Sequence, residues 1–123
     1  MNDRLDDLGQ AIVRALPESV TGYQVANGEL TIAARADDIV KVVTFLRDDP
    51  GCQFIAFVDV TAVDWPQREK RFDVVYHLLS PTKNWRVRIK AEVDEKASVP
   101  SIIEVFPGAN WFEREVFDLY GVP

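Results

Sequence analysis

The last fifteen residues, ANWFEREVFDLYGVP (109–123), hold the densest group of side chains that could do chemistry. Glu113, Glu115 and Asp118 lie close together in this segment. Neighbouring carboxylates can act as general acid and general base when their environments separate their pKa values. However, no nucleophile or metal ligand stands near them in the sequence, so the spacing is a weak signal for catalysis. A hydrolase that uses Glu115 and Asp118 is therefore one hypothesis, and not the favoured one.

The same segment is rich in the residue types that dominate binding hot spots. Trp111, Arg114 and Tyr120 stand among the carboxylates, and Trp, Tyr and Arg are the side chains most enriched at such positions. Arg114 and Asp118 form an i,i+4 pair, which contributes only a few tenths of a kcal/mol when exposed. Stability alone does not explain the clustering. An interface is the sharper interpretation, and a solvated helix that covers a sheet is the plainer one.

A helix over about 111–120 would position these groups. Asn110 would be its N-cap, Glu113 would complete a capping box with the backbone N–H of Asn110, and Gly121 would be the left-handed C′ residue. Helical periodicity predicts one apolar stripe and one polar side. The stripe contains Phe112, Val116, Leu119 and Tyr120, with Phe117 at its margin. The polar side contains Arg114, Glu115 and Asp118, with Trp111 among them.

Other reactive side chains are few. A lone cysteine, Cys52, cannot form an internal disulfide or complete a thiolate metal site, and we expect it to be buried and inert. The lone histidine, His77, lies in an apolar strand pattern and is predicted to be a hydrogen-bonded core or sheet-face residue rather than a ligand or base. Asp59 and Asp64 give too few ligands for a metal site, and Asp64 begins a predicted strand-ending turn. Phosphate-binding glycine motifs, a zinc-binding HExxH motif and paired cysteines are missing from the sequence.

Composition sets the wider limits. A chain of 123 residues can bury one core, and its formal net charge of −6 disfavours nucleic acid and anionic membranes as partners. The apolar runs are too short to span a bilayer, and the N-terminus is acidic where a signal peptide would be basic. We therefore expect a cytosolic chain that reaches a membrane only through a partner. A small ligand-binding α+β domain is a further alternative, which would require a sizeable closed apolar pocket.

The first half of the chain predicts two helices and a hairpin. Residues 3–16 have apolar positions at helical spacing and end at Pro17. Asn27 and Gly28 lie between two alternating segments and predict a type I′ turn, since both turn positions need positive φ. A second helix should begin with Asp37 as its cap and bury Ile39, Val42, Val43 and Leu46.

Three strands should follow, over 53–63, 71–80 and 84–93. The first of them is almost continuously apolar in its first half, as in a strand covered on both faces, and is predicted to lie in the middle of the sheet. The third alternates cleanly and should have one solvated face. The order α-β-β-α-β-β-β-α over residues 1–123 predicts a single α+β domain with helices packed on a mostly antiparallel sheet.

The segments NWFEREVFDLYGVP, DVTAVDWPQREKRFDVVYHLLS and FPGAN closely resemble the C subunit family (the 30 kDa type) of the proton-pumping NADH–quinone oxidoreductase, respiratory complex I. The likeness covers nearly the whole chain, and the motif W-x-E-R-E-x-x-D-L-Y-G is long and chemically unusual. Related domains occur in membrane-bound hydrogenases and photosynthetic NDH-type complexes, which the short motif alone does not exclude. The segment RFDVVYHLLS resembles the bacterial respiratory version.

The resemblance implies a non-catalytic structural subunit of the peripheral arm on the cytoplasmic side of the bacterial inner membrane. Such a subunit binds no flavin, iron–sulfur cluster or quinone of its own, and it packs against the large D subunit, which helps to form the quinone site. It implies seven signature positions that anchor the terminal helix against neighbouring subunits: Trp111, Glu113, Arg114, Glu115, Asp118, Tyr120 and Gly121. Family members continue beyond the equivalent of Pro123 with a GHPDLRR-like segment, so an excised or truncated core domain is expected.

Overall fold

The computed structural model describes residues 3–68, 72–93 and 99–120, and for residue 3 and residues 117–120 it describes the backbone only. The elements follow the predicted order α-β-β-α-β-β-β-α, with one short 3₁₀ helix added before the second α-helix. They are α1 (Asp3–Ala15), β1 (Val20–Ala26), β2 (Glu29–Ala34), η1 (Ala36–Asp38), α2 (Ile39–Asp48), β3 (Ala56–Asp64), β4 (Phe72–Ser80), β5 (Trp85–Val93) and α3 (Ala109–Tyr120).

The strands form one sheet in the order β1-β2-β5-β4-β3. Three of its neighbouring pairs are antiparallel, and the β2–β5 pair is parallel, which confirms the prediction of a mostly antiparallel sheet. The β1–β2 turn has Asn27 at φ 54° and Gly28 at φ 76°, as a type I′ hairpin requires. The chain is therefore an α+β domain built on a single mixed sheet.

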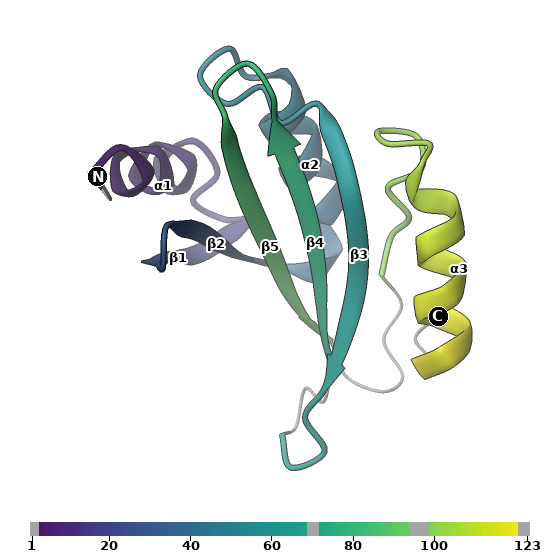
Figure 1. Ribbon diagram of the computed structural model, residues 1–123. Coiled ribbons are helices and arrows are strands. Elements are labelled where there is room, and N and C mark those ends of the chain that lie inside the picture. Colours follow the sequence, from purple (N-terminus) through teal and green to yellow (C-terminus); the bar gives the residue numbers. More distant parts are fainter. Residues whose placement is uncertain (1–2, 69–71, 94–98, 121–123) are drawn as a thin grey trace.

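The two faces of the sheet differ because side chains alternate along each strand. One face, here called the covered face, carries buried apolar residues such as Ile32, Tyr76 and Ile89. Figure 1 shows α2 lying behind the strands, while α1 packs on β1 and β2 and α3 packs on β3. The other face, here called the open face, carries Asp59, His77 and Arg88 side by side in register across β3, β4 and β5. The predicted solvated face of 84–93 is thus confirmed.

The first helix docks closely on the first strand. The hydroxyl of Tyr23 in β1 donates a hydrogen bond of 2.6 Å to a carboxylate oxygen of Asp6 in α1. A Cβ atom at Gly9 would lie 2.4 Å from the Tyr23 ring, so only glycine allows this approach. The helical spacing of apolar residues in 3–16 is confirmed by the burial of Leu5, Leu8, Ile12 and Leu16.

Two predictions about this part of the molecule are wrong. Asp37 does not cap α2, because it lies inside η1, and Asp38 precedes α2 without a side-chain capping hydrogen bond. The strand predicted over 53–63 lies at the edge of the sheet and not in its middle. Its apolar residues Val60 and Ala62 face the core, whereas Val58 and Val63 are exposed on the uncovered side.

Candidate interface on the terminal helix

The terminal helix is fixed to the sheet by its apolar side. Phe112 makes an edge-to-face contact with Phe57 of β3, with ring centroids 5.6 Å apart. Ala109 and Val116 are buried in the same core cluster as the covered face of the sheet. Aromatic pairs of this geometry contribute beyond the area that they bury. The described part of the predicted apolar stripe therefore faces the core, as expected.

Glu113 has a different role from the one predicted. Helix α3 begins at Ala109, two residues earlier than expected, so Asn110 lies inside the first turn and cannot be an N-cap. One carboxylate oxygen of Glu113 accepts a 2.7 Å hydrogen bond from Oγ of Ser101, and the other accepts a 2.9 Å bond from the backbone N–H of Ile102. Glu113 is only 5% exposed. It ties the preceding segment to α3 rather than closing a capping box.

This buried carboxylate also affects the sheet beneath it. Burial, with the negative charge of Glu113 as a second cause, raises the pKa of Tyr76. The Tyr76 hydroxyl has no hydrogen-bond partner among the described residues. The inward side of the signature is therefore a structural site at which Glu113, the 101–102 segment and β4 meet.

The outward side of α3 is open to solvent. Trp111 is 68% exposed, the largest fraction among the exposed large apolar side chains that the structure describes. Arg114 and Glu115 are exposed as well. A large aromatic side chain that stays in water beside two charged residues matches the composition of a binding hot spot. The exposed position of Glu115 gives the hydrolase hypothesis no enclosed pocket around this carboxylate.

The structure does not describe the side chains of the remaining signature positions. Asp118 and Tyr120 belong to the backbone of α3, but their side chains are outside the described set, as are those of Phe117 and Leu119. Gly121 lies outside the described residues altogether. The predicted Arg114–Asp118 pair and the predicted C′ role of Gly121 therefore remain predictions.

A second polar group, on the open face, was not predicted as a unit. Nδ1 of His77 lies 2.5 Å from Oδ1 of Asp59, and Nη2 of Arg88 donates a 2.9 Å hydrogen bond to Glu29. A β-bulge between Phe57 and Asp59 shifts the register by one residue. Without this shift Asp59 would pair with Tyr76 and face the core, because a one-residue slip moves a side chain to the other face.

His77 is therefore a hydrogen-bonded sheet-face residue, as predicted, but its partner was missed. The alternation of β5 was the available signal for the basic side of this group, since it places Arg86 and Arg88 on one face. The bulge in β3 left no comparable signal in the sequence.

A third polar group lies at the β3–β4 turn, where buried Asp73 accepts hydrogen bonds from Trp65 Nε1 at 3.0 Å and from Arg68 at 2.6 Å.

The structure also shows where the other reactive side chains lie. Cys52 is 2% exposed, and burial, followed by the nearby Asp49 carboxylate, raises the pKa of its thiol to about 12. Asp64 ends β3 and Trp65 begins the turn, as predicted. Within the described ranges, no cluster of three or more His, Cys, Asp or Glu residues could hold a metal ion. No helix in that part of the chain is long and apolar enough to cross a membrane.

Known proteins of one family match this chain over most of its length. Residues 32–123 match the family described as "Respiratory-chain NADH dehydrogenase, 30 Kd subunit". The C subunit of NADH-quinone oxidoreductase from Rhodopseudomonas palustris (strain TIE-1) is 62% identical over 118 residues, which is 96% of this chain and 58% of that protein. The corresponding protein of Parvibaculum lavamentivorans, which has the same name, is 53% identical over 99% of this chain and 61% of its own length. The chain thus spans about three fifths of these relatives.

A solved structure has the same fold. A chain in the structure of the membrane-bound sulfane sulfur reductase (MBS), an archaeal respiratory membrane complex, superposes with a TM-score of 0.81 at 26% identity. The match covers 98% of this chain and 69% of that chain. The family match covers well over half of the sequence, including the helix that carries the signature. This protein therefore belongs to the respiratory-chain NADH dehydrogenase 30 kDa subunit family.

Proposed function

We propose that this chain is a non-catalytic structural subunit of a proton-translocating NADH–quinone oxidoreductase. In this proposal it sits in the peripheral arm, on the cytoplasmic side of the bacterial inner membrane, and packs against the quinone-site subunit. Electrons pass from NADH to quinone through flavin and iron–sulfur clusters on other subunits. The names of the curated relatives, at 53–62% identity, support this complex over the sulfane sulfur reductase, whose chain is 26% identical.

The proposal rests on one observation: the side chain of Trp111 is exposed on a helix whose opposite side packs against the sheet. Glu113 and Phe112 fix the inward side through a buried carboxylate and an aromatic contact. The exposed side chains of Trp111, Arg114 and Glu115 are therefore presented on a rigid element. A preorganised surface loses less conformational entropy on binding, so such a surface suits a permanent contact between subunits. The signature positions Asp118, Tyr120 and Gly121 extend the proposed contact toward the end of α3.

The test is retention of the quinone-site subunit by the tagged full chain, measured by co-purification and by a titration at micromolar concentration. Trp111→Ala and Arg114→Glu should each weaken retention, because hot-spot truncations cost roughly 2 kcal/mol or more, which is more than tenfold in affinity. Ile55→Ala is the matched control for an exposed apolar side chain, and Arg14→Glu reverses the same charge on α1. Both controls should bind as the unmodified chain does.

The outcome against the proposal is equally specific. If the unmodified chain does not retain the quinone-site subunit when both are present at micromolar concentration, the proposed partner is wrong. If it does, but Trp111→Ala and Arg114→Glu bind as well as the two controls, then the partner is contacted through another surface and the assigned role of α3 is wrong.

A further inference from the structure

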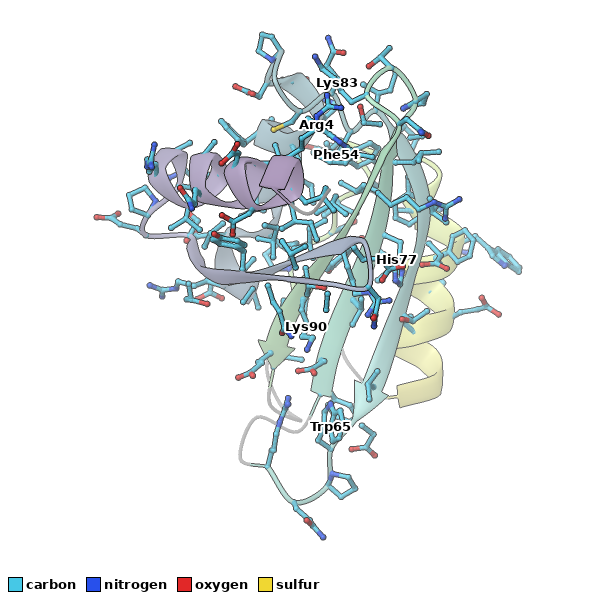
Figure 2. All side chains as sticks on the ribbon, turned by 60° about the vertical axis from the view of Figure 1, so that its left-hand side comes forward. Arg4, Phe54, Trp65, His77, Lys83 and Lys90 are labelled. Atoms are coloured by element: carbon cyan, nitrogen blue, oxygen red, sulfur yellow. The ribbon has the colours of Figure 1, made fainter. Side chains whose placement is uncertain are left out.

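The open face of the sheet contains a hollow with a volume of about 160 Å³. Its walls come from four strands. They include Glu29, Val58, Asp59, His77, Arg86 and Arg88. This hollow lies on the other side of the sheet from the helices that cover the core. In Figure 2, His77 and Lys90 lie along the strands, and Trp65 lies beyond the strand ends.

The acidic side chains of this face are already committed to partners. Asp59 is hydrogen-bonded to His77, and Glu29 forms an ion pair with Arg88. Farther along the sheet, Asp73 pairs with Arg68 at 2.6 Å, and Glu92 lies 3.9 Å from the same guanidinium. Within the described residues, each of these four carboxylates therefore already lies beside a basic side chain.

Some basic side chains of this face have no ion-pair partner among the described residues. Among the described residues, Arg86 and Lys90 have no ion-pair partner, and both are exposed. The Nε–H group of Arg88 is buried and has no hydrogen-bond partner in the part of the chain that the structure describes. The formal charges of the face balance, but two of its cations, Arg86 and Lys90, are left without an ion-pair partner among the described residues.

We propose that this hollow binds a side-chain carboxylate of an extended acidic segment on a neighbouring protein of the complex. Arg86 would donate hydrogen bonds to the carboxylate, and a guanidinium recognises a carboxylate through two parallel N–H donors. Lys90 lies four residues farther along β5, a distance of about 13 Å in a strand, so a second acidic side chain four residues away in an extended segment would reach it.

The surroundings favour a protein segment over a free anion. Val58 is 40% exposed at the hollow, and Val63 is equally exposed on the same strand. The backbone and the sheet-facing side chains of an extended peptide would cover this apolar surface while its carboxylates reach β5. A free anion would leave the valines in water. The proposal rests on the proposed function only in assuming a partner within the complex, and it concerns a surface separate from α3.

The test uses the full chain and a synthetic ten-residue probe in which Glu alternates with Thr, with binding followed by fluorescence anisotropy at low salt. The probe should bind, and Arg86→Gln should weaken binding by roughly tenfold, because one charge-assisted contact is lost. Lys90→Gln should weaken it by a smaller factor. Lys41→Gln on α2 removes the same charge from an exposed position off the sheet and should leave binding unchanged. Circular dichroism checks that each variant is folded.

Several outcomes would overturn this proposal. One is equal binding of a probe in which Gln replaces Glu, and another is equal binding by Arg86→Gln and the unmodified chain. Competition by inorganic phosphate that also depends on Arg86, with no preference for the peptide, would identify a free-anion site instead. A change in sedimentation with Arg86→Gln, without any effect on the probe, would identify a contact between two copies. None of these measurements involves the quinone-site subunit or Trp111, so the two proposals can fail separately.

Discussion

The covered face and the open face of the sheet are built from alternate residues of the same strands, yet they use different chemistry. On β5, Ile89 is fully buried while the next residue, Lys90, is exposed. The covered face buries apolar side chains in one continuous core. The open face arranges charged groups in pairs that remain partly in contact with water. Burial of apolar area dominates folding, whereas exposed pairs contribute little, so the covered face accounts for most of the stability and the open face is free for the binding proposed above.

This comparison is tested most directly by truncating the side chains of two neighbouring residues in one strand. Ile89→Ala should lower the free energy of unfolding by about 2–5 kcal/mol, because it removes buried methyl groups and leaves a cavity. Lys90→Ala should change it by less than about 0.5 kcal/mol. Urea unfolding monitored by tryptophan fluorescence measures both values. Equal effects would show that the open face also supports the fold.

The second prediction concerns the polar contact on the covered side. Glu113→Ala should cost about 2–3 kcal/mol, since it leaves the buried N–H of Ile102 without its acceptor and removes the bond from Ser101. Glu115→Ala, on the exposed side of the same helix, is the control and should cost less than about 0.5 kcal/mol. The same urea titration applies. A loss at Glu115 as large as at Glu113 would contradict the division of α3 into an anchoring side and a binding side.

A smaller effect should be visible in the pH dependence of stability. The ordinary pKa of the Cys52 thiol is 9.0, and its pKa in the fold is about 12. The protonated thiol is favoured by the folded state, so its contribution is fully present below pH 9 and is lost as the pH rises toward 12. Between pH 8 and pH 10 the unmodified chain should lose about 1 kcal/mol more than Cys52→Ala. Parallel pH curves for the two proteins would be the contrary result.

The smallest effect is expected on the open face itself. A double-mutant cycle of Glu29→Gln and Arg88→Gln should give a coupling energy below about 1 kcal/mol, because both side chains are nearly half exposed. The coupling should decrease further in 1 M salt, which screens exposed charges. A salt-insensitive coupling above about 2 kcal/mol would mean that this pair behaves as a buried one.

Local rules of sequence predicted much of the fold. The Asn27-Gly28 turn and the first helix depend on residues that lie next to one another, and both are confirmed. The predicted position of β3 was wrong because an apolar run concerns the faces of a strand, whereas the place of the strand in the sheet depends on hydrogen bonds at its two edges. Here α3 covers one side of β3, and the other side remains exposed at Val58 and Val63.

The candidate sites were harder to predict, for two physical reasons. Glu113 bonds to the segment around Ser101 and Ile102, and this contact depends on the packing of a loop that sequence periodicity does not describe. Asp59 reaches His77 only because one extra residue in β3 changes the register. Helical periodicity placed Trp111 and Arg114 on the polar side of the helix, and both are exposed in the structure.

The parallel pairing of β2 with β5 has a consequence for the order in which the chain acquires its structure. Residues 30–34 find their sheet partners only at residues 87–91, although the hairpin with β1 can close locally. During synthesis the first hairpin must therefore wait, with one strand edge unpaired, until β5 has left the ribosome. Such long-range closure slows folding and exposes an edge that other chains can pair with.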